Sequence, residues 1–486
     1  MKIAAINSKK RFEIYKSKIQ YLKKTTTNSY FQASTMKAFL DNIKGDKGIW
    51  TFVVLLAIFS FMPVFSASSN LAYMNHGTGN TVAYLAKHFA HIALGFFILY
   101  RVQKIQYHRF RFISRLLMPV SWALLLLTMI AGVEQGSAHR WLRVPILGVT
   151  FQPSAFASIV LMMFVARYLA KVDVQNATFK QSVINLWIPV GITLALILPN
   201  NFSTTALIFL MVLMLTFVGN YSLKHTAYVI GIAVTVFVFF ILTAKIIQKT
   251  NPEHTPKIFA RVKTWENRLD SFFDDKKTED KEKSDDDYQI EKAKTAIASG
   301  GIYGLGPGKS VQKHFLPQSS SDFIFAIIVE ENGLLGGISV LVMYILLFIR
   351  FVIAAHKANT VFGKLLVVGL GFPIIFQALI NMGVAVQLLP VTGQTLPLIS
   401  SGGSAIWMTC VSIGIIISVT KKDEEIAEEQ AEKANRDEVL KKLIDEQIAR
   451  DERLEMEALQ TINNIEDDQD YSIQEANPMN AVLHKK

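Results

Sequence analysis

Long apolar blocks alternate with short polar segments along most of this chain. Ten of the blocks approach the about 20 residues that a helix needs to cross the hydrocarbon core of a bilayer. Soluble domains seldom contain such blocks, and the mean hydropathy of +0.31 agrees with a membrane location. The pattern predicts an all-α polytopic membrane protein with about ten transmembrane helices. The predicted spans are residues 49–66, 83–101, 116–133, 151–170, 183–198, 202–218, 226–247, 323–349, 364–388 and 403–420.

The polar segments around these spans divide the chain into three regions. Residues 1–48 are polar and lysine-rich, residues 49–420 hold the spans, and residues 421–486 are predicted to form a charged helical tail in the cytoplasm. Segment 248–322 is the longest connection and is predicted to be a large extracytoplasmic loop between spans 7 and 8. Span 1 is predicted to be an uncleaved signal anchor, although residues 67–69 offer a cleavage site.

The distribution of the net charge of +11 is explained by membrane topology and not by binding to a nucleic acid. With the N-terminus inside, the short inner loops hold twelve lysines and arginines, whereas the short outer loops hold Arg140 and Arg143. This bias predicts that both termini are cytoplasmic, and we expect no nucleic-acid partner. The single cysteine, Cys410, lies inside the last span and excludes an intramolecular disulfide. It is typical of a small core residue.

The candidate chemistry begins in a glycine-rich stretch before span 8. Five glycines and two prolines lie between Gly300 and Pro317, and Asp322 then stands at the mouth of the apolar span. An ionisable group at this depth is a functional hypothesis by default, and its alternative is an N-cap of the following helix. Glu330 and Glu331 lie further in, where they are predicted to pair with a buried polar group or to orient the loop.

Three other segments carry polar groups close to the membrane surface. Segment 140–143, Arg-Trp-Leu-Arg, suits either a headgroup-level anchor or a clamp for phosphate, and both interpretations stay open. Segment 381–404 is rich in Gly, Pro and Ser without formal charge, and is predicted to form a second wall of the same cavity. The Ser/Thr-rich turn at 199–205 is typical of helix capping.

Together, these segments resemble the SEDS family (shape, elongation, division and sporulation), the bacterial group that contains FtsW and RodA. Within that family, residues 304–313 are more similar to FtsW than to RodA, which indicates division rather than elongation. The blocks that carry the resemblance are Arg140-Trp141-Leu142 with Gln152-Pro153-Ser154, Tyr288-Gln289 through Gly300-Gly301, Leu316-Pro317 with Ser321 through Gly333, and Asn381-Met382-Gly383 through Gly402-Gly403-Ser404.

The resemblance implies a peptidoglycan glycosyltransferase that polymerises lipid II at the outer face of the inner membrane during septal cell-wall synthesis. Asp322 would be the general base, and Arg140 and Lys313 would contact the leaving pyrophosphate. No metal-ligand spacing is visible in the sequence, and Mg²⁺ or Mn²⁺ bridging the phosphates of the substrate stays open. Further candidates for substrate binding are Gln152, Ser154, Arg261, Ser400 and Glu330.

The same resemblance implies a class B penicillin-binding protein, a transpeptidase, as partner, together with other proteins of the division machinery. Three alternatives stay open: a lipid II flippase, a RodA-like polymerase of elongation, and a scaffold that would leave Asp322 dispensable. A flippase needs polar groups along a path through the membrane. Here the charged and Gly/Pro-rich segments gather at the outer face, which favours the polymerase.

The chain also departs from the family pattern at several polar positions. Ala155 and Ser158 stand where the family usually has Glu and Lys, so an acid and a base are missing from span 4. Asn201 and Ser203 replace a usual Asp and Gly, and residues 320–321 are Ser-Ser instead of His-Thr. These departures concentrate the catalytic hypothesis on Asp322.

Overall fold

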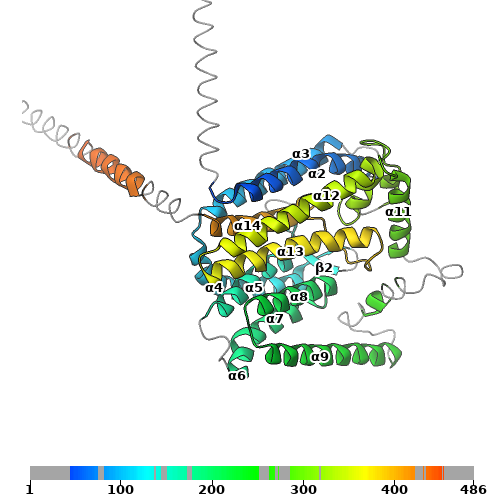
Figure 1. Ribbon diagram of the computed structural model, residues 1–486, viewed down its shortest axis with the longest axis horizontal. Helices are drawn as coiled ribbons and strands as arrows, with labels where there is room; N and C mark the ends of the chain where they lie inside the picture. Colours follow the sequence, from blue (N-terminus) through cyan, green and yellow to red (C-terminus); the bar gives the residue numbers. More distant parts are fainter. Residues whose placement is uncertain are drawn as a thin grey trace, which may run out of the picture. The chain divides into compact units, whose positions relative to one another are not determined.

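The computed structural model describes a large part of the chain, in two compact units formed by residues 1–420 and 421–486 (Figure 1). Within the second unit, residues 434–450 form an exposed helix. The described residues are 44–74, 81–135, 138–143, 150–171, 178–250, 262–266, 268, 272, 285–316, 319–421, 431, 434–450 and 453.

The first unit is a bundle of apolar helices. Seven helical segments of the described residues are long and apolar enough to cross a membrane. They are α2 (Lys47–Met74), α3 (Thr81–Gln103), α4 (Phe110–Ala131) with the 3-10 turn η1 (Tyr107–Arg109), the continuous run α6 (Phe179–Ser182), η2 (Val183–Trp187) and α7 (Ile188–Ile197), α9 (Leu223–Thr250), α12 (Ile324–Lys357) and α13 (Val361–Ala385). Three shorter apolar helices are α5 (Pro153–Leu169), α8 (Phe202–Val218) and α14 (Gly403–Val419).

The prediction of a helical multi-pass membrane protein is confirmed, and each of the ten predicted spans coincides with one of these helical segments. The span predicted at 202–218 has the bounds of α8, and Asn201 caps that helix through the bond from the Thr204 N–H to its Oδ1 (3.1 Å). Cys410 is buried, as expected of a core residue.

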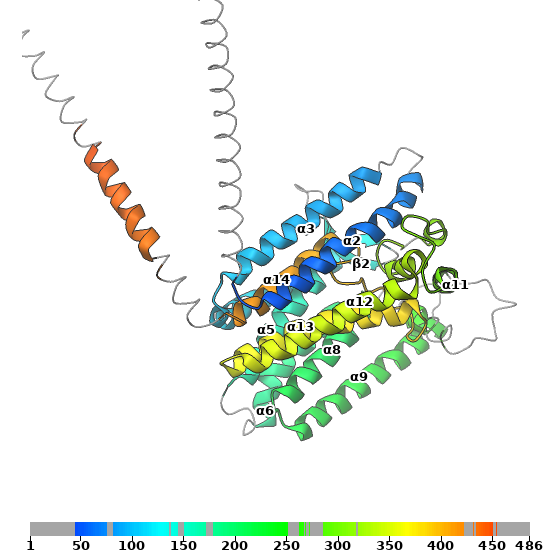
Figure 2. The same ribbon diagram turned by 45° about the horizontal axis from the view of Figure 1, so that its top comes forward.

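Helix α13 lies inside the bundle and α9 lies at its edge. α13 packs against α5, α8, α12 and α14, and most of its residues are buried. α3 packs along α14 and α2, and α2 in turn contacts α12. Figure 2 shows α9 at the edge of the bundle. This helix contacts α8 and has Ala244 buried, so nearly all of its apolar surface faces outward.

A small antiparallel sheet joins α4 to α5, a feature that the prediction of helices alone missed. Its strands are β1 (Val133–Gln135), β2 (Ala138–Arg143) and β3 (Thr150–Phe151), in the order β1-β2-β3. Trp141 lies opposite Val133, and Arg143 lies opposite Thr150. The sheet places Arg140 on its central strand, beside the start of α5.

Helix α12 is interrupted at Gly333, where the glycine-rich loop joins its backbone. Gly333 has φ 69° and ψ −174°, which are not helical angles. The backbone N–H groups of Leu305 and Gly306 donate to the carbonyls of Glu330 and Glu331, both at 2.9 Å. In the other direction, the Leu334 N–H donates to the Gly301 carbonyl, also at 2.9 Å. The loop thus satisfies backbone groups that the break in the helix sets free.

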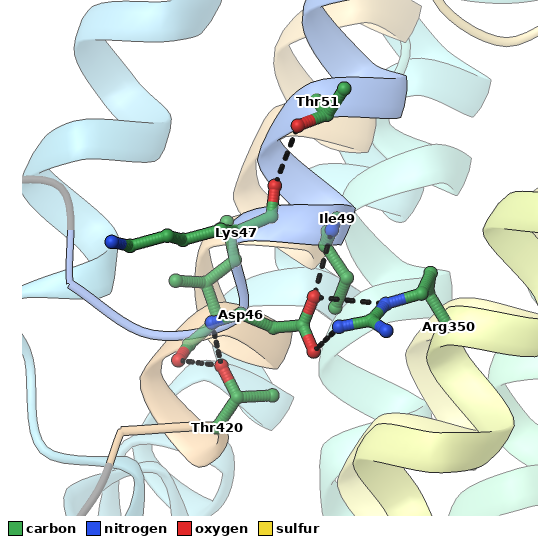
Figure 3. Close-up of polar contacts among 7 residues, drawn as sticks. Asp46, Lys47, Ile49, Thr51, Arg350 and Thr420 are labelled. Carbon is green, nitrogen blue, oxygen red and sulfur yellow. Dashed lines mark hydrogen bonds and ion pairs between the residues drawn. The ribbon is translucent and has the colours of Figure 1, made fainter.

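The opposite end of α12 is tied to the starts and ends of other helices by Asp46 (Figure 3). The Asp46 carboxylate accepts from Arg350 Nε (3.1 Å) and Nη2 (2.5 Å), and also from the Ile49 N–H (2.9 Å). The Asp46 N–H donates to Thr420 Oγ1 at the end of α14 (2.9 Å). We call these groups, Asp46, Ile49, Arg350 and Thr420, the Asp46 junction.

Candidate active site

Asp322 lies in the turn that leads from the glycine-rich loop into α12. α12 begins at Ile324 with Phe323 at its N-cap position, and no side chain in the described part of the chain caps it there. The N-cap interpretation of Asp322 is therefore wrong. The Asp322 carboxylate does not cap α12, which makes it a stronger candidate for a catalytic group.

A buried apolar cluster holds the turn in place. The Phe323 side chain, directly after Asp322, is 1% exposed. It packs with residues from α11 (Asp285–Gly300), from the start of α12 and from the end of α13. The cluster consists of Ala293, Ala296, Leu316, Phe323, Ala326, Ile327, Val384 and Val391. Because its neighbour is locked in this cluster, the backbone of Asp322 has little freedom to move.

Groups from the end of α13 and from the connection between α13 and α14 fix the backbone of the same turn. Asn381 Nδ2 donates to the Asp322 carbonyl and to the Gln394 carbonyl, both at 2.7 Å. Ser400 Oγ donates to the Ser321 carbonyl at 2.6 Å. The Ser401 N–H donates to the Ser320 carbonyl at 2.9 Å. Segment 381–404 therefore packs against the loop that carries Asp322, and its predicted role as the second wall of a cavity stays a prediction.

Two arginines bring positive charge to the Asp322 carboxylate. Arg140 on β2 donates from Nε to the Asn200 carbonyl (2.8 Å), and Arg268 donates from Nη1 to the Val391 carbonyl (3.3 Å). Burial raises the pKa of Asp322 above its ordinary value, while a hydrogen bond from Ser321 and the charges of Arg140 and Arg268 partly offset that rise. A carboxylate with a raised pKa is a better proton acceptor.

Arg268 is a candidate that the sequence prediction missed. It lies in the long loop, 54 residues before Asp322, within an amphipathic piece of aromatic and basic residues. The sequence prediction chose Arg261 in the same loop and did not distinguish Arg268 from its basic neighbours. Trp265, in the same loop, packs against Phe202 with 4.7 Å between the ring centroids, and this contact places Trp265 against α8.

The acids further along α12 form a second polar cluster with the glycine-rich loop. Glu330 accepts from Ser310 Oγ and from the N–H groups of Val311 (2.9 Å) and Gln312 (3.2 Å). Glu331 Oε1 accepts from Ser66 Oγ on α2 and from the Ser310 N–H (3.3 Å). These bonds orient the loop, because both carboxylates bind its backbone.

Lys313 joins this second cluster. The side chain is 7% exposed, and its Nζ donates to the Gly308 carbonyl (2.8 Å) and to Ser66 Oγ (3.3 Å). Since Ser66 also binds Glu331, Lys313 brings positive charge close to the two buried acids. Its predicted contact with pyrophosphate stays a prediction.

The other predicted site residues lie on separate elements. Gln152 precedes α5, and Ser154 lies in its first turn, directly after β3. Both are therefore close in sequence to the strand that pairs with the strand of Arg140. Arg261 lies outside the described residues, so its prediction stays as it was made. Within the described residues, no group of three or more His, Cys, Asp or Glu side chains is placed to hold a metal ion.

Comparison with known proteins places this arrangement in a family. Residues 46–425 match the sequence profile of the FtsW/RodA/SpoVE family, described as cell cycle proteins. Stage V sporulation protein E of Bacillus subtilis is 27% identical over 372 residues, which are 76% of this chain and 94% of that protein. The probable peptidoglycan glycosyltransferase FtsW of Geobacter metallireducens is 30% identical over 385 residues, 78% of this chain and 95% of that protein.

A solved structure shares the fold. A chain of a peptidoglycan synthase complex, studied for its coordination of polymerization and crosslinking, superposes with a TM-score of 0.58. The two chains are 21% identical, and the match covers 78% of this chain and 98% of the other. The family match spans the whole helical bundle together with the turn of Asp322 and the glycine-rich loop. This chain belongs to the SEDS family, the cell cycle proteins that include FtsW, RodA and SpoVE.

Proposed function

We propose that this protein is a peptidoglycan glycosyltransferase that polymerises lipid II during bacterial cell division, with Asp322 as its general base. The observation that carries the proposal is the Asp322 carboxylate, whose pKa is raised by burial and whose backbone is fixed by Asn381 and Ser400 between Arg140 and Arg268. The family membership and the relatives named FtsW support the substrate class.

The reaction joins a sugar hydroxyl to an anomeric carbon that bears a lipid pyrophosphate. As the new C–O bond forms, the bond from the anomeric carbon to the pyrophosphate oxygen breaks, and the electron pair leaves with the pyrophosphate. Asp322 accepts the proton of the attacking hydroxyl. Arg140 and Arg268 stabilise the negative charge that grows on the leaving group, since planar guanidinium groups suit phosphate oxygens.

Segment 381–404, beside Asp322, contains buried polar atoms that have no hydrogen bond within the described part of the chain and are available to a polar ligand. Asn381 Oδ1 and Thr392 Oγ1 are buried without a hydrogen-bond partner in the described residues. Gln394 Nε2 donates to Thr204 Oγ1 (2.9 Å), which connects this segment to the start of α8. Sugar hydroxyls or water would satisfy the two unpartnered atoms, which is the role we assign to this side of the site.

The proposed location follows from charge and from the site. The basic inner loops favour a bacterial cytoplasmic membrane with both termini in the cytoplasm and Asp322 at the outer face. Lipid-linked sugars displayed on that face would reach Asp322 without crossing the bundle. The likeness to a chain of a synthase complex supports a class B penicillin-binding protein as partner. We further propose that this partner crosslinks the strands made here.

The experiment is lipid II polymerisation in liposomes by purified protein with its cognate transpeptidase. Asp322→Asn keeps the shape of the side chain and removes the base, so we expect the rate to fall by about 100-fold or more. Asp287→Asn makes the same charge change on α11 and serves as the matched control. Full activity of a folded Asp322→Asn protein would refute the assignment of the base.

The same liposomes separate the polymerase from the flippase. A flippase would move fluorescent lipid II between leaflets without producing glycan strands. In that case neither the wild-type protein nor Asp322→Asn would form strands. Strands from the wild-type protein, lost with Asp322→Asn and kept with Asp287→Asn, would support the polymerase.

A further inference from the structure

The glycine-rich loop presents apolar side chains that no other part of the described chain covers. Ile302 is 59% exposed, Tyr303 is 82% exposed and Leu305 is 39% exposed. A loop in water gains nothing from such residues, and an exposed apolar group of this kind marks a contact surface. We call Ile302, Tyr303 and Leu305 the loop tip.

The loop tip adjoins an exposed apolar face of α12. The Leu335 N–H donates to the Ile302 carbonyl at 3.4 Å, so the loop tip lies at the level of Leu334 and Leu335 along the helix. From there, α12 exposes a continuous apolar stripe. Its members are Leu334, Leu335, Ile338, Val342, Ile345, Leu346, Ile349 and Val352. Before Leu334, residues 324–331 of the same helix are buried.

The length of this stripe locates the edge of the hydrocarbon. From Leu334 to Val352 the helix advances about 27 Å at its usual rise of about 1.5 Å per residue. The hydrocarbon core of a bilayer is about 30 Å thick. The stripe therefore fills the apolar layer, and its Leu334 end, where the loop tip lies, coincides with the outer boundary of that layer.

Part of the loop backbone meets the condition for entering a bilayer. Peptide groups at membrane depth must find partners within the protein. Here the N–H groups of Leu305 and Gly306 donate to α12 carbonyls, the Gly304 N–H donates to the Gly300 carbonyl (2.8 Å), and the Gly301 carbonyl accepts from Leu334. Several peptide groups around the loop tip are thus paired within the protein, as a position at the edge of a bilayer requires.

We propose that the loop tip is a bilayer anchor, in which Ile302, Tyr303 and Leu305 insert at the outer edge of the hydrocarbon. Tyr303 suits this depth because tyrosine rings favour the boundary between hydrocarbon and headgroups. Lys309, exposed on the same loop, faces the anionic headgroups. The anchor holds the loop, and through the break in α12 it sets the depth of Asp322 relative to the bilayer. This last consequence rests on the proposed function, whereas the anchor itself does not.

The test places a nitroxide label on the loop tip of the complete protein in vesicles of phosphatidylethanolamine and phosphatidylglycerol. Cys410→Ala provides a background without cysteine, to which Tyr303→Cys is added. Ile338→Cys on the stripe of α12 is the lipid control, and Lys294→Cys, exposed on α11, is the water control. Collision of the label with oxygen, which dissolves in lipid, is compared with collision with a water-soluble nickel chelate.

The proposal expects the label at position 303 to resemble the label at Ile338, with high oxygen accessibility and low accessibility to nickel. Accessibility to nickel equal to that at Lys294 would overturn it. The label could instead be exposed to water in the protein by itself and become shielded from both reagents only when the transpeptidase is added. This result would also overturn the proposal and assign the loop tip to that partner. If Tyr303→Cys fails to fold, Ile302→Cys gives the same comparison. None of these readouts depends on polymerase activity.

Discussion

The two ends of α12 are secured in different ways, and the difference separates support from function. At the Asp46 junction, a carboxylate accepts from a guanidinium and from the Ile49 N–H, and the Asp46 N–H donates to the Thr420 hydroxyl (Figure 3). At the other end, the backbone pairing of residues 301–306 with residues 330–335 carries much of the attachment, and the carboxylates of Glu330 and Glu331 add bonds to the loop backbone. One carboxylate oxygen there is left without a hydrogen bond, since Glu331 Oε2 is buried without a partner in the described residues.

This contrast indicates why the site lies where it does. A carboxylate whose hydrogen bonds are all made by the protein, such as that of Asp46, stabilises the fold but has nothing left to offer a substrate. Asp322 is fixed through its carbonyl and its neighbours, so the carboxylate remains available while its position is set. Backbone attachment is thus compatible with chemistry at the side chain.

The largest effect on folding is expected from Gly333→Ala. The φ of 69° with a ψ of −174° is a conformation open almost only to glycine, and a Cβ there would overlap the carbonyl oxygen of Ile302. Strain and overlap together should cost about 3 kcal/mol or more. Thermal unfolding in detergent would show a large fall in Tm.

Gly308→Ala is the matched control for Gly333. Gly308 also has a positive φ, of 76°, but nothing lies within 4 Å of the position of an added Cβ. The free energy of unfolding should therefore fall only by the about 1–2 kcal/mol that an alanine costs at a positive φ. Equal falls in Tm for the two variants would contradict the view that the loop joins α12 at Gly333.

The next effect concerns charge beside Asp322. Arg140→Lys keeps the charge but loses the planar fork that binds two phosphate oxygens at once. We expect polymerisation to fall by about 10-fold to 100-fold, because donors to a growing negative charge contribute strongly to rate. Arg109→Lys, exposed far from the site at the start of α4, should leave the rate unchanged. An unchanged rate for Arg140→Lys in a folded protein would leave the headgroup anchor as the role of this strand.

How far these features could be foreseen depends on whether they are local. The spans followed from apolar blocks, and Asp322 stood out because it is an acid beside such a block. Nonlocal features were missed: the break at Gly333 looks in sequence like a tolerated glycine in a helix, because its partner, the loop at 301–306, is brought there by the fold. Arg268 was missed for the same reason.

The small sheet shows a further limit. Strands of two to six residues carry too little alternation of apolar and polar residues to be recognised, and only pairing across the turn makes them strands. The position of Lys313 likewise depends on α2, which contributes Ser66 from a segment 247 residues earlier in the chain. Sequence patterns predicted a lysine near the site but not its burial beside two acids.

A smaller effect is expected from pH. Because the pKa of Asp322 is raised in the folded protein, its base form is lost at a higher pH than for an ordinary aspartate, and the polymerisation rate should fall on acidification through that raised pKa. The stability of the fold is expected to change with pH in the opposite direction to the rate. The folded state binds the proton more tightly than the unfolded state, so stability rises as pH falls through the raised pKa, and the ionised carboxylate costs stability at neutral pH.

Asp322→Asn removes that cost and tests the sign. At neutral pH, its Tm should equal or slightly exceed that of the wild-type protein, and the difference should shrink as pH falls. A Tm clearly below the wild type at pH 7 would mean that the carboxylate stabilises the turn, contrary to the raised pKa.

The smallest effect is expected at the Asp46 junction, and it concerns stability alone. Asp46→Ala removes the bond to the Ile49 N–H and the ion pair with Arg350, which together should contribute about 1–3 kcal/mol. Lys47→Ala, at the neighbouring exposed position, is the matched control and should leave Tm nearly unchanged.

Combining Asp46→Ala with Arg350→Gln should lower the stability by less than the sum of the two single changes, since both break the same ion pair. Polymerisation per folded molecule should stay at the wild-type rate. If Asp46→Ala instead slowed polymerisation as much as Arg140→Lys, the two ends of α12 would act as one unit, and the division between a supporting end and a catalytic end would fail.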